Sequence, residues 1–337
     1  MLHLAQRPLF FDFTYMKKLT KSAFNRARDF LATDSRKLEW HLFEYHFTGI
    51  AGSREKVIRE LKFFQNPDGG YGKALEPDVR MEDSSVVATK FALQILIDIQ
   101  VSVEEKLVQD GIAYLLNTYD KRKSVWPLVT EKVMDAPHAP WWDVEGLEKE
   151  FGSYLANPKA GVLRCLLEYQ ELVPKELIDH ITRTLIAHFE KLPTKMNFFD
   201  AISYLLLYQA EGLDNEDKNK LFSKLKKTGI ALVNTNPSDW TGFAIKPLWL
   251  SPSPISPLAN TFGGLTEQNL DFEITNQNKD GSWSPTWSWG TSYPTSWKVA
   301  EKEWKGVLTL ATLRSLRDYG RIDEHEPKLS GYKYYID

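Results

Sequence analysis

The stretch Asn276-Gln277-Asn278-Lys279-Asp280-Gly281-Ser282-Trp283 is a polar turn that ends in an aromatic residue. An earlier stretch, Gln65-Asn66-Pro67-Asp68-Gly69-Gly70-Tyr71-Gly72, repeats the same order of an amide, an Asp-Gly pair and an aromatic residue after an apolar, helix-like run. Amide and Asp side chains in such turns bond to backbone groups, and Gly permits positive φ. We therefore expect each stretch to reverse the chain between two helices, with its aromatic ring packed against the helix just completed.

Apolar periodicity predicts helices on both sides of these turns and along most of the chain. The predicted pairs are 19–31 with 37–47, 55–64 with 85–99, 104–118 with 158–169, 175–191 with 198–210, 219–232 with an irregular proline-rich segment after 236–240, and 265–275 with 303–319. Several second helices, such as 85–99 and 198–210, are apolar on nearly every side, and a helix of that kind is buried on every side. The sequence therefore predicts an all-α protein, an α/α toroid (barrel) of about six helix pairs with a buried inner ring inside an amphipathic outer ring.

The helical pattern also sets the expected domain organisation. Residues 1–18 form an N-terminal extension, residues 19–320 a single α/α toroid domain, and residues 321–337 a C-terminal tail that follows the expected C-cap at Gly320. Met16, followed by Lys17-Lys18-Leu19, is an alternative start to Met1, and residues 1–15 lack the pattern of a signal peptide.

The composition is that of a soluble protein, with 42% hydrophobic and 26% charged residues. No apolar run approaches the roughly 20 residues of a transmembrane helix. The net charge of −3, with both signs interspersed, argues against a nucleic-acid partner. The single cysteine, Cys165, forms no internal disulfide and suits a reducing compartment, so we expect a cytoplasmic protein.

The helix followed by Gln/Asn-x-Asp-Gly-x-aromatic resembles the QW repeat of the terpenoid cyclase and protein prenyltransferase superfamily. The segment Glu303-Trp304-Lys305-Gly306-Val307-Leu308-Thr309 is similar to the closing helix of those proteins. The resemblance implies an α/α barrel and a prenyl-like or terpenoid-like ligand. In that repeat the aromatic residue packs between neighbouring helices, which implies a structural role for Tyr71 and Trp283.

The sequence departs from this family at its usual catalytic motifs. It has no Asp-x-Asp-Asp acid motif of the class II cyclases, and the nearest run, Asp78-Val79-Arg80-Met81-Glu82-Asp83, does not fit. One cysteine does not supply the zinc ligands of the prenyltransferases or of the lanthionine cyclases. We therefore expect no metal and no cofactor, and the sequence leaves open whether the chain is an enzyme.

The loops between first and second helices should meet at one mouth of the barrel, at the N-terminal ends of the inner helices. These loops carry acidic residues, one His and many Trp, a composition that suits a mostly apolar or ring-shaped small-molecule ligand. The candidate catalytic residues are Glu76, Asp78, Asp135 and His138. The candidate ligand-binding residues are Trp141, Trp142, Asp143, Trp240, Trp287, Trp289 and Trp297.

Two chemistries fit this mouth. In a terpenoid-like reaction, indole faces stabilise a carbocation and Asp78 or Asp135 supplies the proton, although a helix N-terminus lowers the pKa of a carboxyl group and only strong burial reverses that. In a carbohydrate-active enzyme, a glycoside hydrolase or lyase, Trp rings stack on sugars and two loop carboxylates act as acid and base. A third hypothesis is a non-catalytic binding protein on the same scaffold.

Overall fold

The computed structural model describes residues 16–150 and 154–326, and within these ranges it is all-helical with isolated β-bridges but no strand. The all-α prediction is confirmed. Residues 1–15 and 327–337, most of the expected N-terminal extension and C-terminal tail, lie outside the described residues. The helices are α1 (Lys21–Thr33), α2 (Lys37–Phe43), α3 (Ser53–Phe64), α4 (Val86–Asp98), α5 (Lys106–Asn117), α6 (Val144–Glu150), α7 (Lys159–Glu168), α8 (Lys175–Lys191), α9 (Phe198–Tyr208), α10 (Asn215–Leu232), α11 (Pro247–Leu250), α12 (Gly264–Thr275) and α13 (Pro294–Asp318).

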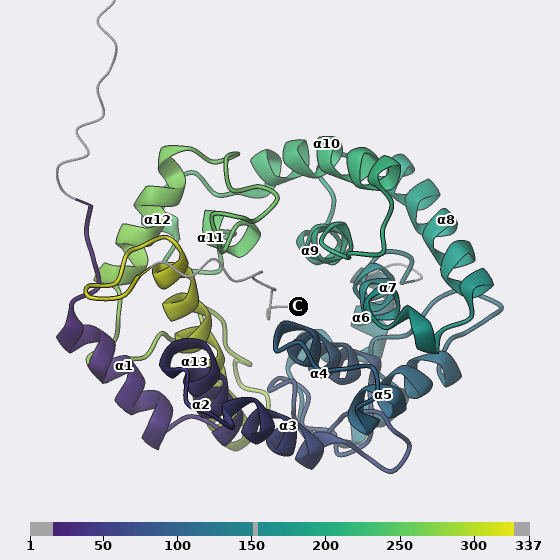
Figure 1. Cartoon of the computed structure of the whole chain (residues 1–337), viewed down its shortest axis with the longest axis horizontal. Helices are drawn as coiled ribbons and strands as arrows, with labels where there is room; N and C mark the ends of the chain where they lie inside the picture. The colour runs from purple at the N-terminus through teal and green to yellow at the C-terminus, as the bar shows by residue number, and fades with distance from the viewer. Residues whose placement is uncertain (1–15, 151–153, 327–337) are drawn as a thin grey trace, which may run out of the picture.

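Two kinds of helix follow from two kinds of sequence. In α4 every residue from Val86 to Ile97 is buried, as its all-round apolar sequence predicts. In α8 the buried residues form one stripe, because they recur at helical spacing: Ile178, Ile181, Leu185, Ile186 and Phe189. Figure 1 shows α4, α7 and α9 nearer the middle of the molecule and α5, α8 and α10 outside them. Contacts between α4 and α5, α7 and α8, and α9 and α10 join the two sets.

The two ends of the described chain meet. Leu19 N donates to Arg321 O at 2.8 Å, and α13 packs against both α1 and α2 (Figure 1). Arg321 and Ile322 are almost completely buried, so the packed region continues beyond Gly320, where the sequence predicted the domain to end. Within the described ranges no helix is long and apolar enough to cross a membrane.

The two turns quoted from the sequence share one structure. In each, the Asp carboxylate accepts a hydrogen bond from the backbone N–H two residues on, Asp68 from Gly70 at 3.0 Å and Asp280 from Ser282 at 2.9 Å. This is the local bond expected of an Asp in a turn, and it holds the reversal between α3 and α4 and between α12 and α13.

Both turns place a glycine against the backbone of another helix. Gly69 has φ +86° and Gly281 has φ +92°. A Cβ on Gly69 would lie 2.5 Å from the carbonyl oxygen of Asp110 in α5, and a Cβ on Gly281 would lie 2.3 Å from the carbonyl carbon of Arg26 in α1. Only glycine fits either position without moving a helix.

The glutamine of each turn bonds to the same helix that its glycine touches. Gln65 Nε2 donates to Leu107 O in α5 at 3.2 Å, and Gln277 Nε2 donates to Ala23 O in α1 at 3.0 Å. In the first copy the contacted helix is the next long outer helix along the chain. In the second copy it is the first helix of the chain, so one repeated contact joins the C-terminal part of the described chain to its beginning.

The closing aromatic residues also occupy equivalent places. The backbone N–H of Tyr71 donates to Thr89 Oγ1, and that of Trp283 donates to Thr309 Oγ1. Both rings are buried, and Trp283 Nε1 donates to Glu273 O at 2.9 Å, in the helix just completed. Each aromatic residue therefore ties its turn to the helix that follows, α4 or α13.

Several expected boundaries differ from the structure, and the largest differences concern the start of α13 and the segment before α7. Helix α13 begins at Pro294, nine residues before the predicted Glu303, because Pro at the first helical position has its φ already set for a helix. The segment expected to be a loop between 118 and 158 contains α6. The first difference matters for the site, because it places Trp297 and Trp304 on one helix, seven residues apart and on one face.

Candidate functional site

A cavity of about 500 Å³ is lined by loop residues and by residues of α6, α9, α11 and α13. Its lining is almost entirely apolar and aromatic. The lining residues are Asp78, Leu128, Trp141, Trp142, Gly146, Leu147, Asn157, Phe198, Phe199, Phe243, Trp249, Trp287 and Trp304. A concave, mostly apolar pocket with a few polar groups is the usual form of a small-molecule site.

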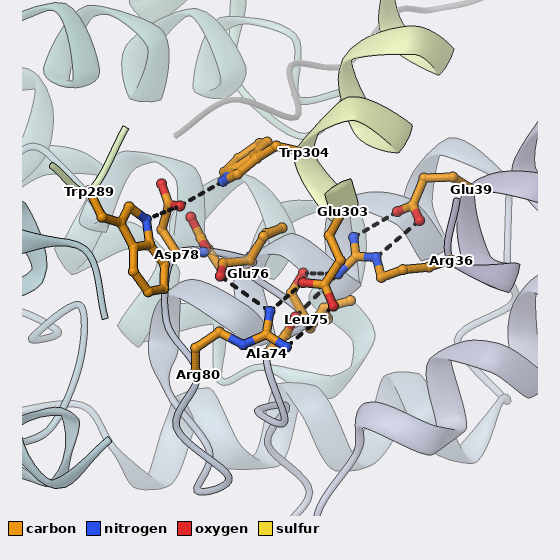
Figure 2. Close-up of polar contacts among 11 residues, drawn as sticks. Arg36, Glu39, Ala74, Leu75, Glu76, Asp78, Arg80, Trp289, Glu303 and Trp304 are labelled. Atoms are coloured by element: carbon orange, nitrogen blue, oxygen red, sulfur yellow. Dashed lines mark hydrogen bonds and ion pairs between the residues drawn. The ribbon is translucent and has the colours of Figure 1, made fainter. Parts of the chain in front are cut away.

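Asp78 supplies the carboxyl group of this cavity. It lies in the loop between α3 and α4 and is 3% exposed. Its Oδ1 accepts hydrogen bonds from two indole N–H groups, Trp289 Nε1 at 2.7 Å and Trp304 Nε1 at 2.8 Å. Figure 2 shows both indoles directed at this one oxygen from opposite sides. Two Trp residues more than 200 residues away in the sequence therefore fix this carboxyl group.

Burial raises the pKa of Asp78 to about 6, because removing the carboxylate from water disfavours its charged form. The indole N–H groups of Trp289 and Trp304 and the charge of Arg80 lower the pKa, but together they only partly offset the burial. Trp287 acts in the same direction, although its Nε1 makes no hydrogen bond of normal geometry. With a pKa of about 6, Asp78 is mostly carboxylate at pH 7 and about one tenth carboxylic acid.

The two oxygens of Asp78 have different surroundings. Oδ1 accepts from two donors, whereas no hydrogen bond to Oδ2 is found in the part of the chain that the structure describes. Since Oδ1 already faces two N–H groups, the proton of the acid form belongs on Oδ2. Asp78 lines the cavity, so this proton is available to a ligand bound there.

The backbone on both sides of Asp78 is held by a neighbouring loop and by Glu76. Asp78 O accepts from Ala139 N at 2.9 Å, and an antiparallel bridge joins Val79 to His138. The Glu76 carboxylate accepts from Asp78 N. The carboxyl group thus sits on a segment with little freedom to move.

Two ion pairs hold this loop from outside the cavity (Figure 2). Arg36 binds Glu39 of α2 at 2.7 Å and donates to the carbonyl oxygens of Ala74 and Leu75. These contacts fix the part of the loop that comes just before Glu76.

Arg80 makes the second ion pair, with Glu303 of α13. Glu303 is the residue before Trp304. This ion pair therefore fixes the position of the loop relative to α13, the helix whose Trp304 donates to Asp78. Because Arg80 is neutralised by Glu303, it lowers the pKa of Asp78 less than an unpaired cation at the same place would.

Three of the candidate ligand-binding residues line the cavity: Trp141, Trp142 and Trp287. Trp141 is 43% exposed and lies at the entrance, whereas Trp142 is buried. The Nε1 atoms of Trp142 and Trp287 have no hydrogen-bond partner among the described residues. The indole N–H of Trp142 is therefore left for a ligand, whereas that of Trp287 acts on Asp78.

The other candidate Trp residues support the wall rather than line it. Trp289 binds Asp78, and the rings of Trp289 and Trp297 lie 5.8 Å apart. Trp240 is fully buried and donates to Asn234 O at 2.9 Å, in a region that does not line the cavity.

The remaining candidate acids and the histidine are separated from the cavity. Asp135 is exposed, and Asp143 accepts from Glu145 N at the start of α6. His138 is buried, with Nδ1 2.7 Å from Ala136 O. None of these three residues lines the cavity, and Asp78 alone of the four catalytic candidates does.

Trp304 and most of the apolar lining were not predicted as site residues. Trp304 was expected near the start of the closing helix, and its Nε1 donates to Asp78, 226 residues away in the sequence. Phe198, Phe199 and Trp249 come from α9 and α11, whose N-terminal ends border the cavity. A signal for the two Phe residues was present, because they are the first two residues of the predicted helix 198–210 and directly follow a loop.

Asn157 is the second polar residue of the lining. It is buried and accepts from Ser203 at 3.1 Å through Oδ1.

Comparison of the chain with protein-family models, with curated proteins and with solved structures gives no match.

Proposed function

We propose that this chain is a terpenoid-cyclase-like protein that binds an apolar, unsaturated ligand in the aromatic cavity, with Asp78 as the proton donor. The observation that carries the proposal is the Asp78 carboxyl group, which lines the aromatic cavity, is 3% exposed, accepts both indole hydrogen bonds at Oδ1 and has its pKa raised by burial to about 6. An acid poised near neutral pH is suited to general acid catalysis.

The proposed reaction begins with transfer of the Asp78 proton to a carbon–carbon double bond of the ligand. The π electrons of that bond form the new C–H bond, which leaves a carbocation on the ligand and a carboxylate on Asp78. Trp289 and Trp304 stabilise this carboxylate by charge-assisted hydrogen bonds at Oδ1. The Asp78 carboxylate then takes a proton from a carbon next to the cation, and the electrons of that C–H bond form the new double bond. Asp78 is an acid again and the composition of the ligand is unchanged, so the product is an isomer or a cyclised form of the substrate.

The aromatic lining supports this chemistry in two ways. It excludes water, which would otherwise add to the cation. Indole and phenyl faces also attract a cation by about 1–2 kcal/mol each when desolvated. Trp142, Trp249 and Trp287 line the cavity and offer such faces.

The lining also favours this reaction over glycoside hydrolysis. A glycoside hydrolase needs two carboxyl groups roughly 5–10 Å apart across the substrate. Among the described residues that line the cavity, Asp78 is the only one with a carboxyl group. The Glu76 carboxylate accepts from the backbone N–H of Asp78, and Asp135 is exposed outside the cavity.

The fold and location belong to the same proposal. An α/α toroid is supported by the buried helices inside amphipathic ones and by the repeated turn that joins α12 and α13 to α1. A cytoplasmic location is supported by the single cysteine, Cys165, which suits a reducing compartment.

Deuterium transfer tests the proposal. The protein is incubated with β-farnesene in deuterated water, and the recovered hydrocarbon is analysed by mass spectrometry. We expect deuterium on carbon with the wild-type protein and none above background with Asp78→Asn, while both proteins bind the hydrocarbon. Asp135→Asn is the matched control, because Asp135 is an exposed carboxylate outside the cavity, and it should behave as wild type. Equal incorporation by Asp78→Asn and wild type would refute the proton transfer.

A further inference from the structure

A second, smaller cavity of about 90 Å³ adjoins the aromatic cavity and has a polar wall. The two cavities share Phe198, Trp249 and Trp287. The residues that line only the small cavity are Lys246, Leu248, Glu273, Trp283, Ser284, Thr286, Leu308, Ala311, Thr312 and Ser315. This space, which we call the head pocket, lies between α11, α12 and α13 and accepts only a small group.

The head pocket contains a buried ion pair. Lys246 Nζ lies 2.5 Å from Glu273 Oε1, and each side chain is 9% exposed. Asn269 Nδ2 donates to the same oxygen at 3.0 Å. The ammonium group also lies near the ring of Phe272, 5.1 Å from its centroid. The pair is therefore held rigidly and is neutral as a whole.

This arrangement leaves hydrogen-bonding capacity at the wall. Glu273 Oε2 accepts no hydrogen bond from the described residues, and it is not among the fully enclosed atoms. Lys246 has three N–H groups, and within the described chain the hydrogen bond to Glu273 is the one found for them. Thr286 Oγ1 is enclosed and has no partner in that same part of the structure. The pocket thus offers an acceptor and two kinds of donor at close range.

The charges of the pair exclude most ligand groups. The Glu273 carboxylate repels an anionic group, and the Lys246 ammonium repels a cationic one. A purely apolar group would leave Glu273 Oε2 and Thr286 Oγ1 unpaired in a dry site, which costs free energy. A neutral hydroxyl both donates and accepts, so it satisfies Glu273 and Lys246 or Thr286 together.

We propose that the head pocket binds a neutral hydroxyl group of an amphiphile whose apolar part fills the aromatic cavity. This inference rests on the proposed binding of an apolar ligand there, and it names the class of ligand as an apolar alcohol. It does not depend on proton transfer from Asp78. The preferred ligand carries its hydroxyl at one end, because the head pocket opens beside Trp249 and Trp287 at one side of the larger cavity.

The test uses four saturated ten-carbon probes, which bind without any reaction: decanol, decyl methyl ether, decanoate and decylamine. Affinities for the full-length protein are measured by isothermal titration calorimetry. We expect decanol to bind about tenfold more tightly than the ether, which accepts but does not donate. Decanoate and decylamine should bind more weakly than decanol. Equal affinities for decanol and the ether would overturn the inference while leaving the aromatic cavity as an apolar binding site.

Two variants locate the hydroxyl. Glu273→Gln should remove most of the preference for decanol over the ether. Thr286→Val serves as the second variant, because it replaces an unpartnered hydroxyl by a methyl group of similar size and should not disturb folding. It should weaken decanol binding several-fold and leave ether binding less affected. Asp135→Asn is the control and should retain the wild-type preference. Unchanged preference in both head-pocket variants contradicts the inference, and failure of all four probes to bind removes both this inference and the proposed apolar ligand.

Discussion

Replacing Gly281 by Ala tests whether the repeated turn fastens the C-terminal part of the described chain to α1. Gly281 has φ +92°, and a Cβ there would lie 2.3 Å from the carbonyl carbon of Arg26 and 2.5 Å from the N atom of Ala27. A non-glycine residue in such a conformation costs about 1–3 kcal/mol. Forcing extra atoms into a packed site costs about 1–3 kcal/mol more. The free energy of unfolding should therefore fall by about 2–6 kcal/mol.

Gly290→Ala is the matched control in the same connection. Gly290 has φ +60°, but no atom lies within 4 Å of a Cβ added there. Its substitution carries only the backbone cost of about 1–2 kcal/mol. Urea unfolding followed by far-UV circular dichroism measures both variants against wild type. Gly69→Ala, whose Cβ would lie 2.5 Å from Asp110 O, should behave like Gly281→Ala.

The decreases in unfolding free energy of Gly281→Ala and Gly290→Ala are then compared. If Gly281→Ala and Gly290→Ala lower the unfolding free energy equally, the close approach to α1 contributes nothing. The proposal that this turn fastens the C-terminal part of the described chain to α1 would then be refuted.

Three further predictions concern Asp78 and the closing Trp. The pKa of Asp78 is raised by burial from 3.8 to about 6, so its contribution to stability is fully present below about pH 3.8 and is lost as the pH rises through 6. Relative to Asp78→Asn, the wild-type protein should therefore lose about 2 kcal/mol of unfolding free energy between pH of about 4.5 and 7.5 in urea titrations, and a pH-independent difference would contradict the assignment. Trp304→Phe removes one N–H donor from Oδ1 and should raise the pKa of Asp78 above 6, seen as a shift in a pH titration; a lowered pKa would show that burial is not the dominant cause. Trp283→Phe leaves the carbonyl oxygen of Glu273 without its indole donor and should lower the unfolding free energy by about 1–3 kcal/mol, whereas an unchanged urea midpoint would show that the bond contributes nothing.

The sequence predicted the all-α class and the two turns because those depend on local chemistry. Asp-Gly pairs such as Asp280-Gly281 form turns through their own side chain and φ preference, whatever surrounds them. The start of α13 was misplaced because Pro294 stands at the end of an aromatic loop, where periodicity gives no signal. The bond from Trp304 to Asp78 joins residues 226 apart, which periodicity also does not indicate.

The choice among the candidate acids depended on contacts that no local pattern reveals. Asp78 and Asp135 are both loop carboxylates, yet Asp78 is bonded by Trp289, 211 residues away, and Asp135 is exposed. The helix N-terminus that follows the loop argued for a lowered pKa at Asp78. Burial raises it instead, because the desolvation of the carboxylate outweighs its hydrogen bonds.

The most direct test of the central claim is the titration of Asp78 itself. The indole N–H groups of Trp289 and Trp304 bond to its Oδ1, so their proton and nitrogen chemical shifts report its charge. We predict that both signals shift together with a midpoint near pH 6, and that neither shifts in Asp78→Asn. A midpoint at or below the ordinary aspartate value of about 3.9 would contradict the account, because Asp78 would then be a carboxylate at neutral pH with no proton to give.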